Sequence, residues 1–176
     1  MMQKKKQLQL SGSLLLVLAI ALSGCTQENE KNPYYVNQEY GFEIIPPAGW
    51  TINENTTDPV KFFCPDKNEY QINVAVKAPV TINESLDKVG EQLIEYYSQT
   101  YFKNFVLISS DQRTINNISA FEIVYSQGLE PNLIQQKQVL FERNETIISV
   151  TYTSLVVTYD SYISVVDTSI NSFRYL

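Results

Sequence analysis

Apolar and polar residues alternate along several stretches of the chain, in the pattern of strands with one buried face. The alternation is clearest in residues 70–77, 118–127 and 146–153. Its apolar positions are Tyr70, Ile72, Val74, Val76, Phe121, Ile123, Tyr125, Ile148, Val150 and Tyr152. Most of these residues are β-branched or aromatic, a composition that favours the pleated surface of a sheet. The pattern therefore predicts three half-buried strands.

Short polar turns connect these strands to their neighbours. Asn144 lies at the centre of one turn, Asn116 and Asn117 form another, and Pro131 interrupts the chain between them. Asparagine tolerates the left-handed backbone that tight turns require. The strands that these turns would join are residues 105–114, 118–127, 135–142 and 146–153. The sequence predicts an antiparallel meander over this region, since tight turns favour antiparallel pairing.

Two segments follow a helical period instead. Residues 85–101 place Leu86, Val89, Leu93, Tyr97 and Tyr101 on one stripe, with Ser85 as N-cap. The C-terminal segment places Tyr159, Ile163, Val166, Ile170 and Phe173 at steps of four and three. The predicted order is three strands, a helix, four strands and a helix. This order indicates an α+β domain with a single antiparallel sheet flanked by helices.

The N-terminal segment has the pattern of an export leader. Lys4, Lys5 and Lys6 precede an apolar stretch from 14 to 22, which is too short to span a bilayer, and Leu-Ser-Gly-Cys25 follows. That ending resembles the lipobox of prokaryotic lipoproteins, in which the cysteine takes up a lipid before cleavage. The alternative is an ordinary leader with an accidental cysteine. We expect a signal peptide at 1–24, lipid on Cys25, a flexible tether at 25–37 and a domain at 38–176.

Charge and composition exclude several classes of function. Without the leader, 10 of the 13 basic residues remain against 19 acidic ones, which argues against nucleic-acid binding and against docking on anionic headgroups. The chain has no histidine, so Ser-His and Cys-His catalysis and histidine-rich metal sites are excluded. With Cys25 lipidated, Cys64 has no partner within the chain, and its strand-like surroundings favour a buried thiol.

Three stretches resemble PsbP-like domains: residues 40–50, which run from Tyr-Gly-Phe into Pro-Pro-Ala-Gly-Trp; residues 115–125; and the C-terminal part, residues 148–153 with 170–173. Asn117 replaces an expected glycine. The resemblance implies an α/β/α sandwich with a central antiparallel sheet. The best-known member supports the oxygen-evolving centre of photosystem II, and a small Ran-binding import factor has a similar fold. The chain looks most like the prokaryotic lipoproteins of the family, many of them archaeal. No metal or partner residue carries over.

Carboxylates are the remaining candidates for acid–base chemistry. Glu91 and Glu95 lie one helical turn apart, although such pairs are more often a solvated helix face. Asp58, Asp66 and Glu69 surround Cys64 and could gather a calcium ion, but their spacing does not match an EF-hand loop.

Aromatic residues and sequons suggest surface roles. Tyr34-Tyr35 and Tyr96-Tyr97 could contribute to an aromatic binding face, whereas Trp50 is expected to fix a corner against the core. Four sequons make Asn55, Asn83, Asn117 and Asn144 candidates for N-glycosylation.

Together these features predict a lipid-anchored binding or assembly module of the cell envelope that faces outside the cytoplasm. We expect no catalytic residues, no metal and no cofactor. The expected partners are the membrane, through Cys25, and an envelope protein. The alternatives are an extracytoplasmic hydrolase with paired carboxylates and a carrier with an apolar cavity lined by Tyr and Phe.

Overall fold

The computed structural model describes residues 32–65 and 73–176. The predicted leader, Cys25 and most of the predicted tether lie outside the described residues, as do Asp66 and Glu69. Within the described part, no helix is both long enough and apolar enough to cross a membrane.

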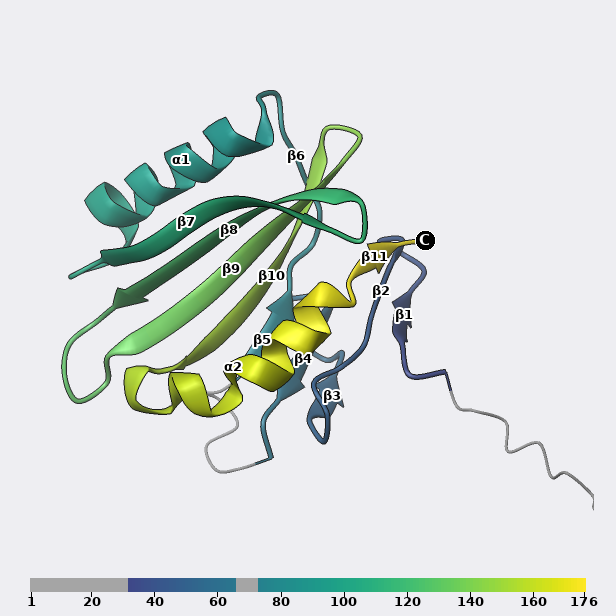
Figure 1. Cartoon of the computed structure of the whole chain (residues 1–176), viewed down its shortest axis with the longest axis horizontal. Helices are drawn as coiled ribbons and strands as arrows, with labels where there is room; N and C mark the ends of the chain where they lie inside the picture. The colour runs from purple at the N-terminus through teal and green to yellow at the C-terminus, as the bar shows by residue number, and fades with distance from the viewer. Residues whose placement is uncertain (1–31, 66–72) are drawn as a thin grey trace, which may run out of the picture. The chain divides into compact units, whose positions relative to one another are not determined.

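An eight-stranded antiparallel sheet forms the centre of the domain (Figure 1). Its strands are β3 (Thr51–Asn53), β4 (Val60–Phe63), β5 (Asn73–Val76), β6 (Val80–Thr81), β7 (Val106–Ile115), β8 (Ile118–Gln127), β9 (Ile134–Arg143) and β10 (Thr146–Leu155). Seven of them follow the order β3-β4-β5-β10-β9-β8-β7, and β6 pairs with β10. The sheet therefore ends in a short edge strand, β3, and a long one, β7.

The predicted meander is confirmed as strands β7 to β10. Two-residue turns join β7 to β8 and β9 to β10, and all four turn residues have positive φ: Asn116, Asn117, Asn144 and Glu145. Positive φ at both central residues matches the twist of a two-residue hairpin. The Asn signals in the sequence thus mark the turns correctly.

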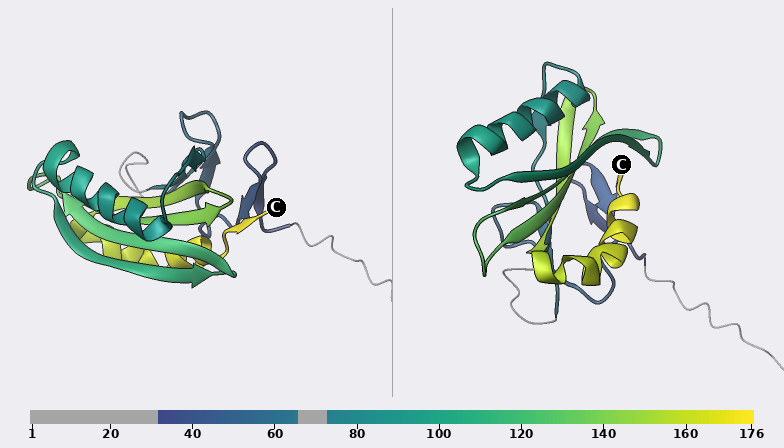
Figure 2. Two further views of the ribbon diagram at one scale, coloured as in Figure 1. Left: turned by 90° about the horizontal axis from the view of Figure 1, so that it is seen from above. Right: turned by 60° about the vertical axis from the view of Figure 1, so that its left-hand side comes forward.

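Two helices cover opposite faces of this twisted sheet (Figure 2). Helix α1 (Leu86–Tyr96) packs on β8 and β9 above Phe121 and Ile123, whereas α2 (Val156–Asn171) covers the other face through Val166 and Ile170. Side chains alternate along β8. Its odd positions belong to the apolar cluster beneath α1, and its even positions face the apolar cluster beneath α2. The domain therefore has three layers and two apolar clusters, which confirms the predicted α+β class.

A second, smaller sheet joins the two ends of the domain. Strands β1 (Tyr35–Asn37) and β11 (Arg174–Tyr175) both pair with β2 (Phe42–Ile44). The sequence analysis placed residues 35–37 in the tether and did not predict β11. Both strands are too short for alternation to be detected, and β11 pairs with residues far away in the sequence. Ordered structure therefore begins before residue 38.

The first helix differs from its prediction at both ends. The Ser85 backbone has the extended N-cap conformation, but its side chain makes no capping hydrogen bond. After Tyr96 the helix widens into a π-helical turn, η1 (Tyr97–Tyr101). A π turn holds more residues than an α turn, so the phase of the helix shifts. Tyr101, predicted on the buried stripe, is consequently exposed.

Candidate functional site

An aromatic cluster forms where α1 ends and β7 begins. The rings of Tyr97 and Tyr125 lie 5.4 Å apart between centroids, and Phe105 lies 5.3 Å from Tyr125. Tyr101 packs edge-on against Phe102 at 4.7 Å. Rings at these separations attract one another through offset and edge contacts. The π-helical turn is thus held by aromatic packing beneath it.

The outer members of this cluster face solvent. Tyr96 and Tyr101 stack at 5.6 Å and are 48% and 61% exposed. Leu129 is 69% exposed. Its neighbour Gly128 donates a backbone hydrogen bond to the Lys103 carbonyl at 3.2 Å, so the loop that carries Leu129 contacts the loop that follows Tyr101. Exposed side chains at the start of β7 extend the apolar area. We call Tyr96, Tyr101, Val106, Leu107, Ile108 and Leu129 the apolar end surface.

Hydrogen bonds connect Tyr97, which packs beside the apolar end surface, to the central sheet. The Tyr97 hydroxyl donates to Oε1 of Gln138 at 3.1 Å, and Gln138 Nε2 donates to the Ser149 hydroxyl at 2.9 Å. Burial raises the pKa of Tyr97, and the bond to Gln138 only partly opposes it. Burial also raises the pKa of Tyr125. Both phenols therefore stay neutral at ordinary pH and act as rigid packing groups.

The second predicted tyrosine pair lies elsewhere. Tyr35 packs against Phe62 at 6.0 Å and donates a hydrogen bond to Glu54, while Tyr34 lies 4.2 Å beneath the Arg174 guanidinium. Both belong to the end of the domain that carries β1, whereas η1 lies at the opposite end (Figure 1). The two tyrosine pairs do not form one face.

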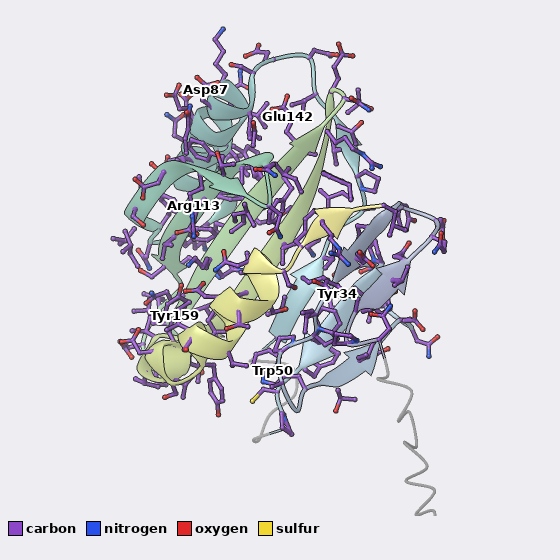
Figure 3. The ribbon with its side chains drawn as sticks, turned by 45° about the vertical axis from the view of Figure 1, so that its right-hand side comes forward. Tyr34, Trp50, Asp87, Arg113, Glu142 and Tyr159 are labelled. Atoms are coloured by element: carbon purple, nitrogen blue, oxygen red, sulfur yellow. The ribbon has the colours of Figure 1, made fainter. Side chains whose placement is uncertain are left out.

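A polar hollow of about 470 Å³ lies between the start of α1 and the β7–β8 hairpin. Asp87 and Glu142 both line it, together with Arg113, and Figure 3 shows their positions. The pKa of Asp87 is lowered, chiefly because the Ser85 hydroxyl donates to its carboxylate. A general acid requires the opposite shift. The hollow is therefore lined by two carboxylates, and the pKa shift of Asp87 is opposite to that of a general acid.

The carboxylates singled out in the sequence do not converge. Glu91 and Glu95 are both exposed on α1, and Glu95 accepts a hydrogen bond from Gln99. Burial alone would raise the pKa of Asp58, but Lys77 and Lys61 outweigh it and lower that pKa. Their ammonium groups lie 2.9 and 3.0 Å from its two oxygens. Among the described residues, no group of three or more His, Cys, Asp or Glu side chains could hold a metal ion.

The sequence analysis missed a buried lysine. Lys137 is 7% exposed on the sheet face beneath α2, and its ammonium lies 2.7 Å from Asp167 and 3.3 Å from Glu122. Arg113 forms a further ion pair with Glu122. In the sequence, Lys137 lies two residues before Val139 and therefore on the same inward face of β9, and this spacing was the available signal of its burial. The network connects the sheet to α2, and its carboxylates are already paired with cations.

The structure confirms two packing predictions. Trp50 is buried at the corner that follows Gly49. Gly49 has a φ of +79°, which glycine adopts without strain. The ring centroid of Trp50 lies 6.1 Å from that of Tyr162. Cys64 is 1% exposed within the same apolar cluster. Its thiol therefore packs as an apolar group.

The four sequon asparagines are all exposed: Asn55, Asn83, Asn117 and Asn144. Their positions leave room for a glycan, and their use stays a prediction. Cys25, the predicted lipidation residue, lies outside the described part of the chain.

The sequence matches no protein-family model and no curated protein. Solved structures, in contrast, share the fold. CyanoP, the cyanobacterial PsbP of Synechocystis sp. PCC 6803, superposes with a TM-score of 0.60 at 17% identity, covering 81% of this chain and 91% of its own. LpqN, involved in cell envelope biogenesis of Mycobacterium tuberculosis, superposes with a TM-score of 0.62 at 11% identity. The match covers 80% of this chain and 87% of LpqN.

A protein of unknown function from Pseudomonas aeruginosa gives a TM-score of 0.54 at 14% identity, covering 79% of this chain and 93% of its own. Likeness at such low identities concerns the arrangement of the elements rather than the chemistry of a site. The three alignments cover 79% to 81% of this chain. The chain therefore has a PsbP-like fold.

Proposed function

We propose that the protein is a non-enzymatic binding or assembly module, held at the outer face of a membrane by a lipid on Cys25. The N-terminal segment supports export and lipid anchoring. Its basic start, short apolar stretch and Leu-Ser-Gly-Cys25 ending have the order and spacing of a lipoprotein signal peptide. The neighbour LpqN, described as involved in cell envelope biogenesis, is compatible with a role in an envelope.

The observation that carries the proposal is the apolar end surface itself, at the end of the domain opposite β1. Only six residues lie between Cys25 and Asn32, so seven residue steps of fully extended chain reach about 25 Å. Strand β1 begins three residues after Asn32, whereas the end of α1 and the start of β7 lie at the other end of the domain (Figure 1). Tyr101 therefore belongs to the end of the domain opposite the strand that follows the tether in sequence. Exposed apolar groups that lie together, as the rings of Tyr96 and Tyr101 do at 5.6 Å, mark interaction sites.

The two alternatives find less support. A hydrolase needs a carboxylate with a raised pKa in its hollow, but the pKa of Asp87 is lowered. A carrier needs an apolar cavity lined by Tyr and Phe, whereas the aromatic rings near η1 pack against one another and the hollow beside α1 is lined mainly by polar groups.

Intact mass and detergent partitioning of the native protein test the anchor. We expect the wild type to carry lipid and enter the detergent phase, whereas Cys25→Ser stays unmodified and aqueous. Cys64→Ala is the matched control and should partition like the wild type, because its thiol is buried. An unmodified, aqueous wild-type protein would refute the anchor. The same spectra would reveal any glycan.

Photo-crosslinking in membranes tests the binding surface. A crosslinking amino acid at Tyr101 should capture one envelope protein, and Leu129→Ser should reduce that capture. Val80 is the matched control, since it is 59% exposed on β6, beside the β9–β10 hairpin and outside the apolar end surface. Equal capture from both positions would contradict the assignment of this surface.

A further inference from the structure

The long edge strand β7 has no neighbour on its outer side within the described residues. It is the last strand of the eight-stranded sheet and pairs with β8 alone, whereas β3 at the other edge has only three residues. A bulge lies near its start, between Leu107 and Ser109. Beyond the bulge, the strand contains neither proline nor lysine, two residues with which sheets commonly protect an edge. Residues 109–115 thus form a regular, accessible edge.

The hairpin geometry identifies which backbone groups point outward. Ile115 and Ile118 close a two-residue turn, and such a closing pair exchanges hydrogen bonds. Hydrogen-bonded residues alternate along an antiparallel strand. Asp111 and Arg113 therefore direct their backbone groups to β8. Ser110, Gln112 and Thr114 direct theirs outward, and their side chains are exposed.

The charges on this edge select one partner. An antiparallel copy of β7 can satisfy the outward groups with the two-fold axis at any residue from 110 to 114. Only the axis at Gln112 places Asp111 of each copy opposite Arg113 of the other. It also pairs Ser110 with Thr114. An opposite-charge pair across two strands stabilises the pairing, and symmetry supplies it twice.

Both charged side chains are free to make this contact. Asp111 is exposed and has no ion-pair partner among the described residues. Arg113 is 35% exposed and uses Nη1 for Glu122. The guanidinium has further donors on its other nitrogens, so it can bind a second carboxylate.

We infer that two copies of this chain associate through their β7 edges, in antiparallel register about Gln112, and join their sheets into one. This contact is isologous, as expected for a two-fold dimer. It uses the strand edge and does not require the anchor at Cys25. A shared membrane would strengthen it by raising the effective concentration of the copies.

Site-directed crosslinking of the full chain tests this register. Gln112→Cys should give a covalent dimer with a short bis-thiol reagent, because the two residues face each other across the axis. Val157→Cys, exposed on α2, should not. The reaction can be followed in whichever fraction contains the protein, so its outcome is separate from that of the lipid test. Crosslinking of Gln112→Cys no stronger than that of Val157→Cys would overturn the proposal.

Charge exchange provides the second test. Asp111→Arg places like charges opposite Arg113 twice and should weaken dimer formation about ten-fold. The double variant Asp111→Arg with Arg113→Asp restores opposite charges and should restore crosslinking in the Gln112→Cys background. Unchanged crosslinking in the single variant, or a product containing a different protein, would contradict association of two copies.

Discussion

Gly90 of α1 lies directly against the ring of Phe121 on β8. A Cβ atom added to Gly90 would lie 2.3 Å from Cε1 of this ring, well inside van der Waals contact. The missing side chain is what lets the helix backbone approach the sheet so closely. The position of α1, and of the π-helical turn that follows it, depends on this contact.

Gly90→Ala should therefore destabilise the domain, although alanine in a helix is normally favoured over glycine by about 1 kcal/mol. We expect the free energy of unfolding to fall by about 1–3 kcal/mol, the usual cost of overpacking. Urea denaturation measures this change in the free energy of unfolding. The same substitution in a Phe121→Leu background should cost less, because the smaller side chain relieves the clash. A stabilised Gly90→Ala protein would show that the helix can move away at little cost.

Lys137→Ala should remove the cation that neutralises Glu122 and Asp167. Breaking a buried ion pair commonly costs about 3 kcal/mol, and we expect a loss near that size. Lys103→Ala is the control, since Lys103 is exposed and its side chain forms no ion pair among the described residues. Denaturation curves that coincide for the two variants would mean that Lys137 contributes no more than a surface charge.

The Asp58 ion pairs should stabilise the fold only above the acidic range. Because its pKa in the folded state lies below the reference value of 3.8, its contribution is fully present above that pH and is lost as the pH falls further. Asp58→Asn and Lys77→Met should each cost about 1 kcal/mol at neutral pH. The stability difference between each variant and the wild type should shrink as the pH falls below 3.8. A stability difference that is independent of pH would contradict this assignment.

Alkaline titration should separate buried from free phenols. Burial raises the pKa of Tyr152 and of Tyr175 to about 12, and it also raises that of Tyr159. Since the fold favours their neutral forms, their contribution to stability is complete below the reference pKa of 10.0 and is lost as the pH rises toward 12. The ultraviolet absorbance of tyrosinate should show a late phase that coincides with unfolding. A single phase near the reference pKa would show that these phenols are accessible.

Local patterns account for the elements that were predicted correctly. The meander could be read from alternation and from Asn116, Asn117 and Asn144, because a hairpin is specified by residues near one another in sequence. Strand β11 could not be predicted, since Arg174 pairs with Glu43, far away along the chain. The π-helical turn was also missed, because helical spacing gives no warning of a phase shift after Tyr96.

The candidate site was only partly predictable. Tyr96-Tyr97 marked the right region, but the exposure of Tyr101 depends on the π turn, and Leu129 reaches the same end through a backbone bond between separate loops. Asp87 and Glu142 share a hollow because α1 and β9 meet there in space. Such proximity arises from tertiary structure and leaves no mark on residue spacing.

The small sheet has a consequence for the order of folding. Strand β2 receives its second neighbour only when β11 is in place, and Glu43 and Arg174 are 131 residues apart. Closing so long a loop is slow compared with forming the local hairpins β7–β8 and β9–β10. We therefore expect the segment from Tyr35 to Ile44 to be fixed late, after the central meander. The first strands of the described domain would then be the last to become rigid, although the ribosome makes them first.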